Sequence, residues 1–281
     1  MEKERITIEI TDREGNVRQH SENDGHTELV WYGSYEPGDR IRVYALSDRF
    51  VRIQADQLLS PANVYIKKGC FDFPIPFGSA KEAYPQEAFT GILHQLSAFY
   101  IEKTSDHKLL SENPLDVREE NTEKLAGENS LPFYYSENEV YPHCTANVET
   151  RGEAIFAARN TIDGVLITPG HGFYPFTSWG NANDPASHID LWFGRKVCVD
   201  EVHLFLRSDF PHDNYWKNAT LSFDGGITKE ITLEKTGNCQ AIVLDTPIVT
   251  ESVRLGSLVK DENEPSPFAS LIQWRVFGRE A

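Results

Sequence analysis

One stretch, residues 207–216, holds the side chains of this chain that are best suited to binding chemistry. It follows a hydrophobic run and combines basic, acidic, amide and aromatic residues. A sugar requires this mixture, because a flat ring covers its C–H face while arginine, asparagine and carboxylate groups bond its hydroxyls. We expect Arg207 to donate to two hydroxyls, Asp209 to orient Arg207, and Trp216 to supply the stacking face. The full predicted site, which is solvent-accessible, consists of Arg207, Asp209, His212, Asn214 and Trp216.

Two other interpretations of this stretch stay open. In a structural one, Arg207 pairs with Asp209 and Trp216 covers the core. In a catalytic one, Asp213 works with His212 or with Asp209 in acid–base chemistry, as carboxylates do in glycosidases. The catalytic interpretation is weaker, because catalysis also needs a deep site and tuned pKa values. The sequence also contains no G-x-S-x-G, H-E-x-x-H, G-x-G-x-x-G or P-loop pattern.

A second candidate wall of the site lies in residues 164–188, which show little strand character. A loop of this length in a compact domain is usually functional or disordered, and its aromatic content argues against disorder. We expect His171 and Tyr174 to join the ligand-binding site. Trp179 is assigned to the core, because tryptophan is usually buried.

Strands must position these loops. Residues 202–207 alternate between apolar and polar side chains, which predicts a strand with one buried face. Residues 189–193 form another strand that ends at Gly194, and residues 153–159 form a short helix. Further strands are predicted for residues 220–223, 229–233, 241–244, 253–258 and 272–277.

The order of these features resembles a known family. It begins with Asn160-Thr161-Ile162-Asp163-Gly164, continues through Trp179 and Ile189-Asp190-Leu191-Trp192-Phe193-Gly194, and reaches a hydrophobic strand ending in Arg207. It closes with Ile272-Gln273-Trp274-Arg275-Val276-Phe277-Gly278. Roughly residues 141–278 therefore resemble the discoidin-type domain. This is the galactose-binding-like β-sandwich, also called the coagulation-factor C-type domain, that is common in bacterial carbohydrate-binding modules.

The resemblance implies a sugar at the loop end of the sandwich, with Arg207 at the position of a frequent ligand contact. It also implies a structural Ca²⁺ beside the Asp163-Gly164 turn, held by carbonyls, the Asp163 carboxylate and a glutamate on the last strand. That glutamate position is Gln273 here, which removes a charge from a site whose affinity depends on charge. Asp163 and Gln273 are thus the candidate metal ligands.

The N-terminal residues 1–104 read as a β-sandwich of their own. Residues 6–10 alternate strictly, and residues 36–39 form a Pro-Gly turn before a strand at 40–45. Further strands are predicted at 50–53, 64–66, 71–77 and 96–101, with the prolines of 71–77 placing that strand at a sheet edge. Residues 105–138 are a polar connector, and residues 139–281 are the second sandwich, which we expect to fold independently. The prediction is an all-β protein of two jelly-roll-like β-sandwich domains.

The composition narrows the choice of ligand. The 281-residue chain has a formal net charge of −16 and a pI near 5.0, which argues against nucleic acid and anionic lipid and favours a neutral sugar or a cation. No apolar run is long enough for membrane insertion. The first residues lack a signal-peptide pattern, which predicts a cytoplasmic protein, or an extracellular one if this sequence is a piece of a longer chain.

The leading functional prediction is non-catalytic recognition of a carbohydrate. One alternative is a glycan-processing enzyme with its site between the domains, and another is a protein-interaction module. The sequence fixes neither the sugar nor the oligomeric state.

Overall fold

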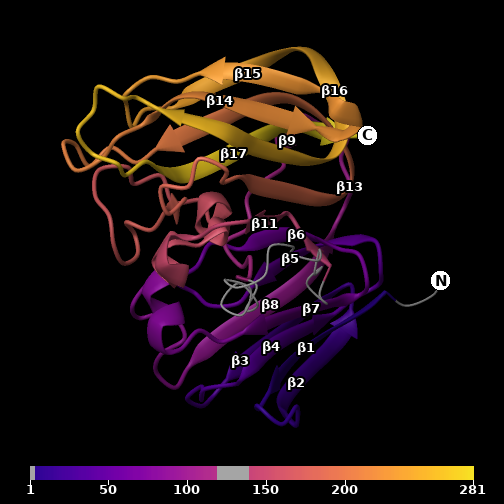
Figure 1. Cartoon of the computed structure of the whole chain (residues 1–281). Coiled ribbons are helices and arrows are strands. Elements are labelled where there is room, and N and C mark those ends of the chain that lie inside the picture. The colour runs from indigo at the N-terminus through magenta and orange to yellow at the C-terminus, as the bar shows by residue number, and fades with distance from the viewer. Residues whose placement is uncertain (1–3, 119–138) are drawn as a thin grey trace.

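The computed structural model describes residues 4–118 and 139–281. Strands make up 48% and helices 8% of the chain, so the all-β prediction is confirmed. The N-terminal half and the C-terminal half form two bodies, one stacked above the other (Figure 1). No helix among the described residues has the length and apolar character needed to cross a membrane.

The N-terminal half consists of two facing sheets. The first runs in the order β2 (Val17–Asp24), β1 (Arg5–Thr11), β4 (Arg40–Tyr44) and β7 (Cys70–Pro74). The second runs in the order β10 (Val140–Tyr141), β6 (Ala62–Ile66), β5 (Arg49–Gln54), β8 (His94–Ile101) and β3 (His26–Trp31). Alternate residues of β1 and β5, among them Ile8 and Ile53, meet in one core. The proline-bearing β7 lies at a sheet edge, as its sequence predicts.

The C-terminal half is built on one eight-stranded sheet. Its main path is β12 (Trp179–Gly180), β17 (Ser270–Glu280), β13 (Ile189–Leu206), β16 (Gln240–Lys260), β14 (Trp216–Phe223) and β15 (Thr228–Thr232). β11 (His143–Ala146) pairs with β13, and β9 (Lys108–Leu109) pairs with β17. The sheet curves around a core that contains Trp179, Trp216 and Trp274 (Figure 1).

In two places, two strands predicted one after the other along the chain form a single long strand in the structure. β13 runs through Gly194, which was predicted to end a strand, and β16 joins the predicted strands at 241–244 and 253–258. The register of β13 shifts between Trp192 and Val197, and Gly194 has a φ of 67°. A Cβ at Gly194 would lie 2.1 Å from the Tyr141 ring, so the glycine permits both the bulge and this close approach.

Within residues 4–118 and 139–281, the helices are short 3₁₀ turns. The predicted helix at 153–159 is two such turns, η4 (Ala154–Phe156) and η5 (Ala158–Ile162). The others are η1 (Gly78–Ala83), η3 (Thr150–Gly152) and η6 (Asp224–Gly226).

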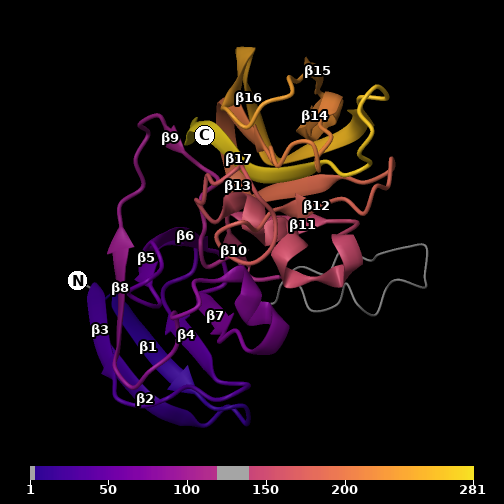
Figure 2. The same cartoon turned by 90° about the vertical axis from the view of Figure 1, so that its left-hand side faces the viewer.

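The first part of the predicted connector is packed against the C-terminal half. Leaving β8, the chain passes along one side of the molecule to β9, beside β17 (Figure 2). Leu110 is buried in the core of the C-terminal half, whereas Leu115 is buried in the core of the N-terminal half. Ser111 Oγ donates to the Trp274 carbonyl at 3.0 Å and accepts from the Val276 amide at 2.9 Å. Residues 105–118 are therefore an interface segment, and residues 119–138 of the predicted connector lie outside the described residues.

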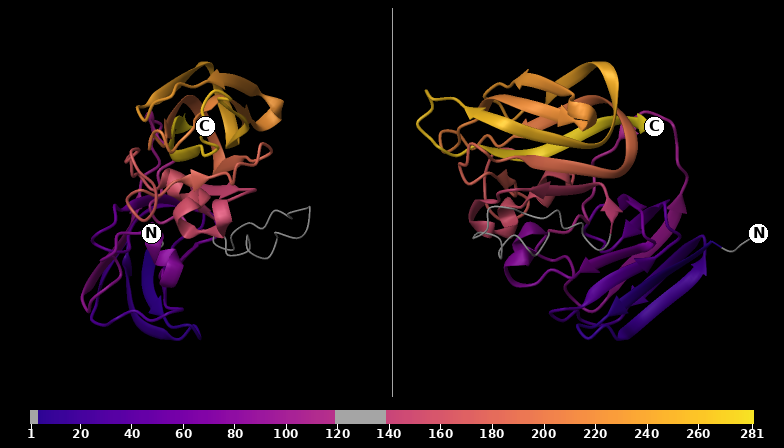
Figure 3. Two further views of the ribbon diagram at one scale, coloured as in Figure 1. Left: turned by 60° about the vertical axis from the view of Figure 1, so that its left-hand side comes forward. Right: turned by 45° about the vertical axis from the view of Figure 1, so that its right-hand side comes forward.

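Arg159 and Tyr174 join the two halves. The buried Arg159 guanidinium donates to the carbonyls of Asp116 (2.8 Å), Pro114 (2.9 Å) and Ala83 (3.5 Å). The Tyr174 amide donates to the Glu82 carbonyl at 2.9 Å. Both views of Figure 3 show the 3₁₀ turns of the middle segment between the two bodies.

These contacts change the expectation for the isolated C-terminal half. A fragment of residues 104–281 should unfold cooperatively and at a higher temperature than a fragment of residues 136–281. The shorter fragment loses β9, the buried Leu110 and both Ser111 hydrogen bonds. Each of these two hydrogen bonds contributes about 1 kcal/mol to stability. Thermal unfolding followed by circular dichroism measures the difference. Equal melting temperatures would show that residues 105–118 do not stabilise the C-terminal half.

Candidate functional site

Arg207 is buried and belongs to an ion pair. Its side chain is 3% exposed, and its guanidinium donates to both carboxylate oxygens of Asp213, from Nε at 3.0 and 2.9 Å and from Nη2 at 2.6 Å. Asp213 is fully buried. Arg207 is therefore not exposed as predicted, and its carboxylate partner is Asp213 rather than the Asp209 of the structural alternative. The loop bends back and places the carboxylate of Asp213 against Arg207.

Asp213 also shapes the turn that precedes it. Its Oδ2 accepts from the Asp209 amide at 2.9 Å, and its own amide donates to the Asp209 carbonyl at 3.0 Å. The turn is thereby closed around the buried ion pair. Asp209 and His212, which lie within this turn, keep partly exposed side chains.

Asn214 and Trp216 also point into the protein. Asn214 Nδ2 donates to the carbonyls of Asp261 (3.0 Å) and Ser266 (2.8 Å), so this side chain anchors the loop before β17. Trp216 is the first residue of β14, is fully buried, and packs against Trp179 with ring centroids 5.8 Å apart. The predicted exposure of both residues is wrong, whereas the prediction that Trp179 belongs to the core is confirmed.

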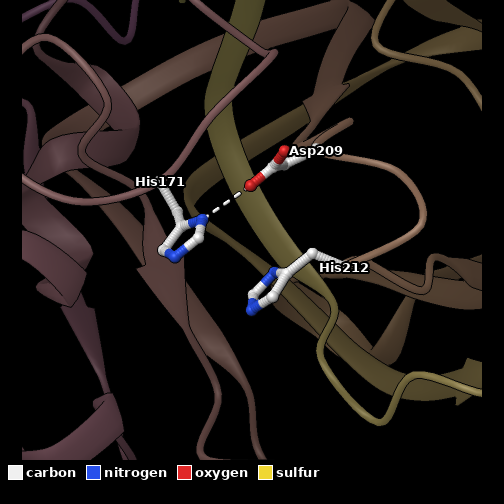
Figure 4. A group of neighbouring side chains, drawn as sticks. All are labelled: His171, Asp209 and His212. Atoms are coloured by element: carbon white, nitrogen blue, oxygen red, sulfur yellow. Dashed lines mark hydrogen bonds and ion pairs between the residues drawn. The ribbon is translucent and has the colours of Figure 1, made fainter.

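Three exposed rings gather where the site was expected. His171 and His212 lie face to face with centroids 4.3 Å apart and an angle of 6° between their planes (Figure 4). Phe268 also stacks on His212, with ring centroids 5.3 Å apart and an angle of 15° between the planes. We call His171, His212 and Phe268 the ring stack. Asp209 completes the group, because its Oδ2 lies 2.6 Å from His171 Nδ1 (Figure 4).

Backbone contacts bring the ring stack together from three loops. The Ser208 amide donates to the Thr168 carbonyl at 2.9 Å, which ties the loop of His171 to the loop of His212. Ser266 Oγ donates to the His212 carbonyl, which ties in the loop of Phe268. Sequence reasoning found His171, Asp209 and His212 but missed Phe268. The signal available was an aromatic residue directly after Pro265-Ser266-Pro267, at the end of a loop that leads into the closing strand.

Tyr174 lies in a different place from His171. It lines a cavity of about 190 Å³ between the two halves, together with Asp163, Arg159 and Tyr84. The structure therefore does not bring Tyr174 into the ring stack.

A groove of about 510 Å³ lies beside the loop of residues 261–267. Its walls include Asn181, Asn183, Asp184 and Lys260. Because Phe268 directly follows this loop, the groove and the ring stack are neighbours along the same loop.

The residues at the Asp163 turn do not fit a calcium ion. Gln273 Nε2 donates to the Asn160 carbonyl at 2.6 Å and to Asp163 Oδ1 at 2.7 Å, so an amide group faces the oxygens that a cation would need. Gln273 Oε1 accepts from the Gly164 amide at 3.1 Å, which fixes this orientation of the amide. Burial raises the pKa of Asp163 to about 7.

No protein-family model matches the chain, and a search of curated proteins finds no match. A search of solved structures returns modules similar to about half of it. The family 32 carbohydrate-binding module of NanJ from C. perfringens, in complex with galactose, has 18% identity over 48% of this chain and 91% of the module, with a TM-score of 0.37. Chitosan-binding module 1 from a Paenibacillus sp. IK-5 chitosanase/glucanase has 21% identity over 49% and 95%, with a TM-score of 0.34.

The fucose-binding module SpX-3 from Streptococcus pneumoniae has 12% identity over 50% of this chain and 95% of the module, with a TM-score of 0.37. The family 32 modules are of the discoidin-like type that the sequence resembles. At these identities and TM-scores we assign no ligand from the comparisons.

Replacing Arg207 by alanine should destabilise the protein by about 3–5 kcal/mol, because the change leaves the buried Asp213 carboxylate unpaired. Denaturant unfolding measures this difference in free energy. The control is Lys229→Ala, which removes an ion pair to the exposed Asp245 and should cost less than about 1 kcal/mol. Equal, small effects of the two substitutions would show that the buried pair does not hold the loop.

Replacing Gln273 by glutamate should create a calcium dependence. The variant replaces the amide donor by a carboxylate beside Asp163 and the Asn160 carbonyl, which are oxygen ligands suited to Ca²⁺. We expect added Ca²⁺ to raise the melting temperature of Gln273→Glu and a chelator to leave that of the native protein unchanged. A native protein that melts at a lower temperature with chelator would contradict this account.

Proposed function

We propose that the C-terminal half binds a carbohydrate at the ring stack and Asp209. The observation that carries this proposal is the exposure of a stacked aromatic group beside a carboxylate. The side chains of His171 and His212 are each 42% exposed and that of Asp209 is 36% exposed, while Phe268 is 51% exposed. Exposed apolar groups that gather in one patch often mark a binding site.

The ring stack offers both kinds of contact that a sugar uses. One face of Phe268 packs on His212, so its exposed area includes the opposite face, which can cover the C–H face of a pyranose. The imidazole nitrogens and the Asp209 carboxylate supply donors and acceptors for hydroxyl groups. The neighbouring groove of about 510 Å³ has room for further sugar units.

A neutral sugar suits the charge around the site best. Asp209 lies in the ring-stack group, and Asp261, Glu262 and Glu264 line the neighbouring groove. The chain carries a net charge of −16, so a uronic or sialic acid would be repelled.

The cavity between the halves gives less support to a glycan-processing enzyme. Among the described residues that line it, Asp163 is the single carboxyl group, whereas glycoside hydrolysis uses a pair of carboxyl groups. We therefore favour binding over catalysis.

A glycan-array screen of the intact protein, followed by affinity measurement on the best ligand, tests the proposal. His212→Ala and Phe268→Ala should each weaken binding about tenfold, because each removes an interaction of roughly 1.5 kcal/mol from a site whose total at millimolar affinity is about 4 kcal/mol. The matched control is Tyr32→Ala, which removes a 76% exposed ring from the N-terminal half. The proposal fails if the intact protein binds no glycan, or if the His212/Phe268 double variant binds as tightly as the native protein.

A further inference from the structure

We propose that His171, Asp209 and His212 form a binding site for a divalent transition-metal ion of the Zn²⁺ type. Each residue offers one ligand atom, a ring nitrogen or a carboxylate oxygen, and these atoms all lie within 4.8 Å of one another. In the described part of the chain, this is the single group of three or more histidine, cysteine or acidic residues with such spacing. Figure 4 shows the three side chains turned toward one another.

To close on an ion, the ligand atoms must approach one another and one ring must turn. Zn²⁺ binds nitrogen and oxygen at about 2.0–2.2 Å, which places tetrahedral ligand atoms roughly 3.3 Å apart. Because a metal lies in the plane of the imidazole that binds it, one of the two parallel rings must turn out of the stack. Both histidines are 42% exposed, so this turn disturbs no buried packing.

The backbone holds the three residues in place. Asp209 and His212 belong to the turn that Asp213 closes. The Ser208–Thr168 hydrogen bond holds the His171 loop against this turn. The ligands are therefore close together before a metal ion binds. The entropic cost of bringing the two loops together has already been met when the protein folds.

An outer carboxylate also orients one of the two rings. Asp213 Oδ1 lies 3.1 Å from His212 Nδ1, and the same oxygen accepts from Arg207 Nη2 at 2.6 Å. A carboxylate that accepts from Nδ1–H leaves Nε2 with its lone pair available, as in many carboxylate–histidine–metal arrangements. The Asp213 carboxylate also adds negative charge close to the proposed ion.

The donor set selects the class of metal. Two imidazoles and one carboxylate suit Zn²⁺, Ni²⁺ or Cu²⁺, whereas Ca²⁺ and Mg²⁺ prefer sites made of oxygen atoms. Three protein ligands leave at least one coordination position for water or for an oxygen atom of a bound molecule. This inference does not depend on sugar binding, because the ligand geometry alone supports it.

Calorimetric titration of the chelator-treated full-length protein with ZnCl₂ at pH 7.5 tests the site. Titration with Co²⁺, whose visible absorption reports nitrogen and oxygen coordination, gives a second readout. We expect one equivalent to bind, and His171→Ala, Asp209→Asn and His212→Ala each to weaken binding at least tenfold. The control is His203→Ala, which removes a histidine paired with a single carboxylate, Glu201, at 2.7 Å.

The three variants should melt at the temperature of the native protein without metal, since the substituted side chains are partly exposed. The proposal is overturned if the native protein binds no Zn²⁺, or if the His171/His212 double variant binds one equivalent with native affinity. Neither experiment contains a glycan, so its failure would leave the proposed sugar binding standing.

Discussion

The buried ion pair between Arg207 and Asp213 is the contact on which the candidate site depends. Asp213 receives hydrogen bonds from the Arg207 guanidinium and from the Asp209 amide, and it lies beside His212. A charge this deeply buried is tolerated only with such a complete set of partners. The pair therefore forces the loop into one shape, and that shape leaves Asp209 and His212 facing solvent.

The neighbouring loops are fixed in the same way, by buried polar side chains that bond backbone groups. Asn214 holds the loop that carries Phe268, and Gln273 joins the Asp163 turn to the last strand. Gln273 here makes the contacts with Asn160 and Asp163 that a bound cation would otherwise make. Loops held by such bonds keep the exposed side chains in place before any ligand arrives, which lowers the entropic cost of binding.

Local sequence patterns predicted the architecture well and the site only in part. Alternation located most strands, because a period of two is a direct consequence of one buried face. It could not show that Arg207 is buried, since that follows from a partner six residues later in a turn of unknown shape. The sequence pattern places Trp216 in the loop, but β14 begins at that residue and turns its ring inward. The sequence pattern does not identify Phe268 as a site residue, because its stacking partner, His212, lies in another loop.

The central claim is that the ring stack is where a carbohydrate binds. Nuclear magnetic resonance of the imidazole groups during titration with a glycan tests it most directly, because His171 and His212 lie in the proposed contact and His203 lies outside the ring stack. The account predicts saturable shifts of the His171 and His212 signals and an unchanged His203 signal. Binding of the glycan with unchanged His171 and His212 signals would contradict it.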